Sequence, residues 1–227
     1  VGASAASYCL QRAQGEINLL NWNELSHLSP QKNFTIFRSG NGTVIPMLDE
    51  RQICLRELGQ GLQDWYEFGL SKTFIGKGMS AVQLVKSLAE RVLGFNDVHF
   101  YKRAQLAAKM ISDVLADSGH GELPDLDQLT IFADYRLPQI LREKGIIVYE
   151  PSLAMRVDEE EELAAGSIEE LSIRAATVWG GEYIRQEMER LSGVKATSAQ
   201  IDSFLWLEAR RLKDSMRPHH RTRTINY

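Results

Sequence analysis

The sequence predicts an all-α fold, because apolar residues recur at helical spacing along most of the chain. One such pattern begins at Pro46, and a second runs from Phe100 to Leu115. Capping residues and glycines bound these stretches, as they do at helix ends. Only residues 145–149 favour a strand, and a single short strand cannot form a sheet.

The composition of the 227-residue chain is that of an ordinary globular protein, with 44% hydrophobic and 25% charged residues. It predicts one domain over 1–227. The net charge of −4 disfavours a dedicated nucleic-acid binder. Cys9 and Cys54 show neither ligand spacing nor a disulfide framework, which favours a reducing compartment. Without a signal peptide or long apolar run, we expect a cytoplasmic protein, with the nucleus or an organelle as alternatives.

The helices can be placed in order from their capping residues. Residues 1–45 are rich in Ser, Gly and Asn, so we expect the least regular part there, with one short helix over 8–14. Ser80 suits an N-cap, and the residues at 167–170 and 197–200 form capping boxes. Gly180-Gly181 should soften the helix that contains them. The longer helices are therefore expected over 46–62, 81–93, 100–115, 167–191 and 197–212.

Residues 130–139 place an acid and a base inside an apolar run that contains Pro138. Proline disfavours helical geometry at the residue before it, so we predict one helix over 127–134 and another over 138–145. Asp134 and Arg136 then lie at the corner, where unpaired backbone donors and side chains can bind a ligand. The alternative is a structural ion pair that caps the break.

Two further patterns suggest ligand contacts. Asp202 lies one helical turn before Trp206, and a carboxylate beside an indole suits a flat, polar heterocycle. The alternative is a carboxylate bonded to a neighbouring helix end. Lys102 lies near a predicted helix start, where a cation opposes the helix dipole unless an anion is close. The alternative is an ordinary exposed lysine.

The segment 219–224 concentrates hydrogen-bond donors. His219, Arg221 and Arg223 could bind a phosphate, and Ile225 and Tyr227 could dock the segment on the domain. The alternative is a solvated basic tail. The histidines form no i, i+4 ligand pair, so we expect no metal site. Neither a glycine-rich phosphate loop nor a G-x-S-x-G motif occurs, which excludes the commonest nucleotide-hydrolase and esterase classes.

Four ordered motifs together resemble the queuosine salvage protein family, the queuosine 5'-phosphate N-glycosylases, from about Pro46 to Tyr227. They are Phe100-Tyr101-Lys102-Arg103-Ala104-Gln105, Phe132-Ala133-Asp134-Tyr135-Arg136-Leu137-Pro138-Gln139, Ile173-Arg174-Ala175-Ala176 and His219-His220-Arg221-Thr222-Arg223-Thr224. Residues 8–13 look like a shortened family helix. The aromatic-rich segment expected before it does not occur, so we expect the N-terminal part to be incomplete.

The resemblance implies an all-α fold similar to helix-hairpin-helix DNA glycosylases. It implies a monomeric hydrolase, without a cofactor, that releases queuine from queuosine 5'-monophosphate for salvage into tRNA modification. Neither a nucleic acid nor a membrane is required as partner. The family's catalytic aspartate falls on Asp134 and its associated lysine on Lys102. The expected substrate-binding residues are Tyr135, Arg136, Asp202, Trp206, His219, Arg221 and Arg223.

Two other classes of function stay open from the residues. The first is a non-catalytic helical module that binds tRNA or DNA with strong salt dependence through a basic C-terminal face. That face would consist of Arg210, Arg211, Lys213, Arg217, Arg221 and Arg223. The second is a structural partner domain, which would need a large exposed apolar patch.

Overall fold

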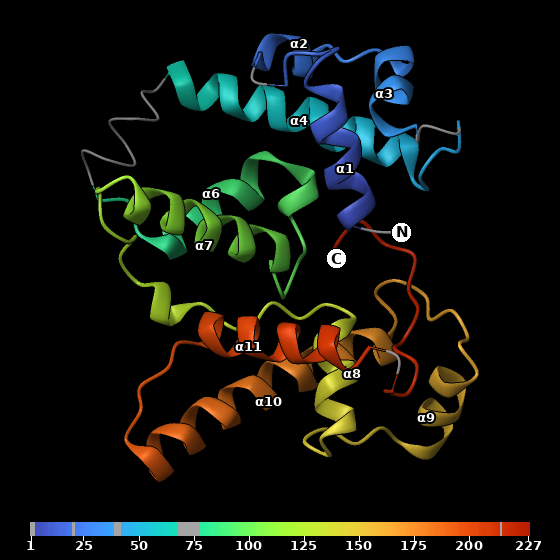
Figure 1. The fold of residues 1–227 in the computed structure, drawn as a ribbon, viewed down its shortest axis with the longest axis vertical. Helices are drawn as coiled ribbons and strands as arrows, with labels where there is room; N and C mark the ends of the chain where they lie inside the picture. The colour runs from blue at the N-terminus through green and yellow to red at the C-terminus, as the bar shows by residue number, and fades with distance from the viewer. Residues whose placement is uncertain (1–2, 20, 39–41, 68–77, 214) are drawn as a thin grey trace. The chain divides into compact units, whose positions relative to one another are not determined.

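The computed structural model describes residues 3–19, 21–38, 42–67, 78–213 and 215–227, and its regular secondary structure is helical (Figure 1). No β-strand occurs in these ranges, where isolated bridges join Arg38 to Val44 and Glu162 to Arg221. The all-α prediction is confirmed. The α-helices are α1 (Ala3–Ala13), α2 (Trp22–Ser26), α3 (Pro30–Phe37), α4 (Leu48–Glu67), α6 (Ala81–Arg91), α7 (Lys102–Asp117), α8 (Arg136–Glu143), α9 (Pro151–Asp158), α10 (Ile168–Ser192) and α11 (Ser198–Arg211), and the 3₁₀ turns are η1 (Leu93–Phe95) and η2 (Leu126–Gln128).

The chain divides into two compact units, each with its own core. The first consists of Val1–Lys77 and Glu90–Gly94, and the second of Gly78–Ala89 and Phe95–Tyr227. The single domain over 1–227 stays a prediction. None of the described helices is both long and apolar enough to cross a membrane.

The first unit is more regular than the sequence predicted, because residues 3–37 contain three helices where one was expected. The side chains of Asn21 and Ser29 cap the starts of α2 and α3. Gly59 lets α4 approach α2 closely, since a Cβ there would lie 2.5 Å from the Ser26 nitrogen. The core includes Cys9, a free thiol.

The second unit packs α8 against α10 and α11. Gly180 and Gly181, expected to soften α10, lie within an unbroken helix and permit close packing. A Cβ on Gly181 would lie 2.6 Å from Ile131, and one on Gly180 would lie 3.3 Å from Leu141. The buried core residues of this unit are Ile131, Leu137, Ile140, Leu141, Ile147, Tyr149, Val157, Leu163, Ile173, Ile201, Leu205 and Ala209.

Most predicted helix starts are confirmed. Ser80 exchanges hydrogen bonds with Gln83 at the start of α6, and Thr197 forms a complete capping box with Gln200 at α11. Ser167 accepts a hydrogen bond from the backbone N–H of Glu170 at α10. The helix expected from Phe100 begins two residues later, at Lys102.

The predicted helix over 127–134 is wrong. Only η2 forms there, and the chain then runs without regular structure to Asp134. Helix α8 begins at Arg136, because the Asp134 carboxylate accepts the backbone N–H groups of Arg136 at 2.7 Å and Leu137 at 3.0 Å. Pro138 is the third residue of α8, where a helical N–H has no partner within the helix. The proline therefore does not delay the start of the helix.

Candidate active site

Two buried carboxylates lie at opposite ends of a three-residue segment. Asp134 and Asp202 are each 8% exposed. Asp202, on α11, accepts the backbone N–H of Phe132 through Oδ1 at 2.7 Å. Asp134 follows two residues later and caps α8, where the helix dipole favours a negative charge. The residues from Phe132 to Asp134 therefore position both carboxylates, although Asp202 lies on another helix.

Burial raises the pKa of Asp202 to about 7. The negative charge of Asp134 acts in the same direction, while the hydrogen bond from Phe132 and the charge of Lys102 oppose the rise. The charges of Asp134 and Lys102 thus act on Asp202 together. The structure brings the two predicted catalytic residues and the predicted heterocycle-binding carboxylate into one electrostatic site.

Lys102 is the first residue of α7, after a strained turn. His99 and Tyr101 have φ angles of 80° and 48°, which non-glycine residues adopt rarely. Asp97 stabilises the turn: its carbonyl accepts the N–H groups of Phe100 and Tyr101, and its Oδ2 accepts the N–H of Lys102 at 3.2 Å. Such strain persists only where surrounding contacts hold it.

Two predicted substrate-binding residues, Tyr135 and Arg136, directly follow Asp134, and a third, His219, contacts Tyr135. The ring centroids of Tyr135 and His219 are 4.6 Å apart, and the Arg136 guanidinium lies 5.4 Å from the Tyr135 ring centroid. Arg136 donates to Gln139 Oε1 at 2.9 Å. Among the described residues Arg136 makes no ion pair with Asp134, so the ion-pair alternative is wrong, although Asp134 does cap the helix.

The segment 219–227 docks through Tyr227, as predicted. Its hydroxyl donates to Glu170 Oε1 at 3.1 Å and lies 3.1 Å from His220 Nε2. The carbonyl of Ile225 accepts from Arg103 Nη1 at 2.9 Å. Burial, followed by the charges of His219 and Arg174, lowers the pKa of His220 to about 4, so this histidine is neutral at physiological pH.

The other predicted binding residues have different surroundings. Arg221 is exposed and pairs with Glu160 at 2.6 Å, while Arg223 is exposed. Trp206 is 38% exposed, and the Arg210 guanidinium lies 4.9 Å from its ring centroid. Asp202 instead faces inward with Leu205 and Ala209 of the same helix. Its partner is the backbone of Phe132, not a helix end.

Sequence reasoning missed the role of Arg174, which is 1% exposed on α10. It forms a two-pronged ion pair with Asp97, Nη1 donating to Oδ1 at 2.8 Å and Nη2 donating to Oδ2, and Nε donates to the Ala133 carbonyl at 3.1 Å. The local signal was a charged residue next to the buried Ile173. Asp97 is 77 residues away in sequence, so the pair could not be recognised from local pattern.

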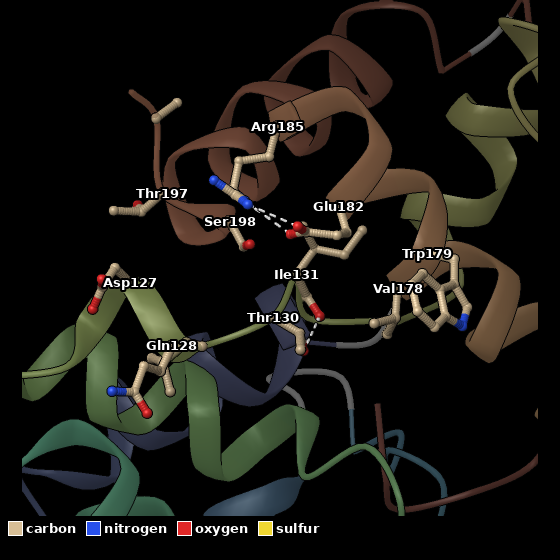
Figure 2. A pocket seen from close by; sticks show the side chains of 12 residues that line it. Asp127, Gln128, Thr130, Ile131, Val178, Trp179, Glu182, Arg185, Thr197 and Ser198 are labelled. Carbon is tan, nitrogen blue, oxygen red and sulfur yellow. Dashed lines mark hydrogen bonds and ion pairs between the residues drawn. The ribbon is translucent and has the colours of Figure 1, made fainter. Parts of the chain in front are cut away.

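Two open cavities lie among the described residues of the second unit. One, of about 470 Å³, lies between residues 127–131, α10 and the start of α11, and Figure 2 shows the ion pair of Glu182 and Arg185 on its wall. The other, of about 420 Å³, includes Tyr101 and Trp179 in its lining. Neither lining contains Asp134, Lys102 or Asp202.

The described part of the chain contains no group of three or more His, Cys, Asp or Glu side chains placed to hold a metal ion. The expectation of a site without metal stays a prediction. The carboxylates, lysine and ring side chains described above supply proton donors, acceptors and charges. This arrangement suits acid–base or electrostatic catalysis on a small polar ligand.

Comparisons with known proteins assign the chain to a family. The model of the family described as queuosine salvage protein matches residues 4–227. A protein of Sphaerobacter thermophilus is 39% identical over 99% of this chain and 71% of its own length. Relatives from Dictyostelium discoideum and Mus musculus are 34% and 33% identical over 82% and 85% of this chain. This chain spans 60% and 62% of their lengths. All three are named queuosine 5'-phosphate N-glycosylase/hydrolase. The chain belongs to the queuosine salvage protein family.

Proposed function

We propose that this protein is a hydrolase that cleaves the N-glycosidic bond of queuosine 5'-phosphate and releases queuine. The names of its relatives support this substrate. The structural observation that carries the proposal is the convergence of Asp134, Asp202 and Lys102. Two carboxylates in different surroundings can perform two different steps of glycoside cleavage.

Asp134 acts on the sugar. Breaking the bond between base and ribose develops positive charge on C1' and the ring oxygen. A carboxylate at the start of α8 can stabilise that charge, attack C1' to form a covalent intermediate, or activate the incoming water. Each of these roles uses the carboxylate of Asp134, which accepts two backbone N–H groups at a helix N-terminus.

Asp202 acts on the base. With a pKa of about 7, its carboxyl retains a proton at neutral pH in an appreciable fraction of molecules. It donates this proton to the nitrogen that leaves C1', and the electron pair of the broken bond stays on that nitrogen. Water supplies the hydroxyl that joins C1', and its other proton restores the acid.

Lys102 supports the two carboxylates in this proposal, and side chains near Asp134 bind the substrate. Lys102 balances the two carboxylates, and Tyr135, Arg136 and His219 offer rings and donors beside the catalytic aspartate. Arg223 is the better candidate for the 5'-phosphate in the C-terminal segment. Arg221 is already paired with Glu160, so a phosphate would have to displace that carboxylate.

The binding of tRNA or DNA by the basic C-terminal face is the alternative function. Ion pairs reduce the positive charge of this proposed face, since Arg211 pairs with Glu208 and Arg221 pairs with Glu160. The buried carboxylates have no role in such a module. Binding that weakens steeply with added salt, without release of a base, would favour this alternative.

The test is mass-spectrometric detection of free queuine after incubation of the protein with queuosine 5'-monophosphate. We expect release by the wild type and a loss on the order of 100-fold or more in Asp134→Asn. Asp113→Asn is the matched control, because Asp113 is an exposed aspartate that pairs with Lys109 on α7. Release that survives in Asp134→Asn would refute the role of Asp134, and no release by folded wild type would refute the proposed function.

A further inference from the structure

The Arg174 guanidinium contacts both segments that carry the proposed catalytic residues. Its Nε donates to the carbonyl of Ala133, the residue directly before Asp134. Its two terminal nitrogens donate to the carboxylate of Asp97, whose Oδ2 also accepts the backbone N–H of Lys102. One buried side chain therefore joins the start of α7 to the start of α8.

The surroundings of this guanidinium leave it little freedom. It lies 4.2 Å from the ring centroid of Phe100 and 4.9 Å from that of Tyr227. Nη1 also lies 3.6 Å from Glu170 Oε1, which accepts the Tyr227 hydroxyl. Rings and carboxylates thus hold the guanidinium in place. Its hydrogen bonds join the segment before α8 to the turn before α7, which belong to different helices.

This set of hydrogen bonds requires the shape of an arginine side chain. The planar fork offers parallel donors to the Asp97 carboxylate and a further donor, Nε, to the Ala133 carbonyl. A lysine ammonium at the same position has one nitrogen, which cannot occupy the places of all three donors. Lysine would retain the positive charge, but the hydrogen bond to either the Ala133 carbonyl or the Asp97 carboxylate would be lost.

We propose that Arg174 is a positioning residue that sets the placement of Asp134 and Lys102 relative to each other. The expected effect on kcat rests on the proposed function, whereas the placement of the two residues by Arg174 does not depend on the reaction. Displacement of a reacting group by about 1 Å can cost on the order of 100-fold in rate, without any loss of substrate contacts. Arg174 acts in this way through its two neighbours and need not touch the substrate.

The kinetic test compares Arg174→Lys with Arg142→Lys. Arg142 is a matched control: it is also buried, forms a two-pronged pair with Asp158, and lies 4.8 Å from the Tyr149 ring centroid. We expect Arg174→Lys to lower kcat on the order of 100-fold with little change in KM. Arg142→Lys should keep wild-type kcat even where its melting temperature falls as much. Parallel losses of stability and kcat in both variants would overturn the proposal.

Amide hydrogen exchange tests the geometry without any activity. Arg174→Lys should speed exchange at the amides of Lys102, Arg136 and Leu137, whose acceptors are the Asp97 and Asp134 carboxylates. Arg142→Lys should leave these three amides protected. Unchanged protection in Arg174→Lys would overturn the proposal even if kcat fell.

A second variant covers the case in which Arg174→Lys does not fold. Asp97→Asn keeps an acceptor for the Lys102 N–H but weakens the two-pronged pair with Arg174, so kcat should fall and exchange should speed at the amides of Arg136 and Leu137. If the wild type releases no queuine, the proposed function fails while the exchange measurement still decides the positioning role. If queuine is released and exchange is unchanged, only the positioning role fails.

Discussion

Replacement of Asp202 by Asn tests the division of labour between the two carboxylates. Asn is almost the same size and keeps an oxygen that can accept the Phe132 N–H, but its amide cannot serve as the acid. Proton donation by a positioned side chain contributes roughly 10²- to 10⁴-fold to rate. We therefore expect Asp202→Asn to lower kcat by a factor in that range.

The pH dependence provides a second measure of the same residue. The acid form of Asp202 is lost as pH rises through its pKa of about 7. The wild-type kcat/KM should therefore fall about tenfold for each pH unit well above that value. The raised pKa comes first from burial and then from Asp134, whose charge a substitution to Asn removes. In Asp134→Asn, the pKa of Asp202 should therefore fall, and the residual activity should begin to decline at a lower pH than in the wild type.

The assay is initial-rate queuine release between pH 5.5 and 9 in buffers of constant ionic strength. Glu208→Gln is the control, because Glu208 lies on the same helix and pairs with Arg211 on the surface. Its profile should match the wild type. A wild-type profile that is flat between pH 6 and 9, or an alkaline limb that persists in Asp202→Asn, would refute the reasoning.

Two further predictions concern the C-terminal segment. Arg223→Ala should raise KM for queuosine 5'-monophosphate roughly tenfold and leave KM for the nucleoside unchanged, because a charge-assisted hydrogen bond contributes about 1.5–3 kcal/mol. Equal effects on both substrates, measured by steady-state kinetics, would contradict this. His220 has a pKa of about 4 in the folded state, so the unfolded chain binds its proton first as pH falls from 6.5. The wild type should lose up to about 3 kcal/mol of stability between pH 6.5 and 4 from this residue, and urea unfolding of His220→Gln should not show that loss. Asp202 titrates in the same pH range, but its protonation stabilises the folded state. The effect of His220 is therefore read from the difference in the free energy of unfolding between His220→Gln and the wild type at each pH.

The helices were largely predictable from the sequence, because their signals are local. Ser80, Ser167 and Thr197 cap helices as expected, and apolar spacing located α4 and α7. The prediction of the α8 start was wrong because a side-chain cap, and not the proline, determines where the helix begins. Pro138 indicated a helix start, but the Asp134 carboxylate starts α8 two residues earlier.

The candidate site was only partly predictable, because its contacts are distant in sequence. The motifs identified Asp134, Lys102 and Asp202 one by one. Their convergence depends on the bond from Phe132 to Asp202, which spans 70 residues. The Arg174 pair with Asp97 spans 77 residues. Neither apolar periodicity nor capping rules carry information over such separations, so the contacts of Asp202 and Arg174 become visible only in the folded chain.

The placement of the two carboxylates also explains why their environments differ. Asp134 accepts two backbone N–H groups at a helix start, a setting that favours its negative charge. Asp202 accepts one N–H at a similar burial and lies within reach of the Asp134 charge, and its pKa is raised to about 7. Two nearby carboxylates are costly to ionise together, and Asp202, which accepts fewer backbone N–H groups than Asp134, is the one with the raised pKa. A single short segment, residues 132–134, therefore sets one carboxyl as the base or nucleophile and the other as the acid in the proposed reaction.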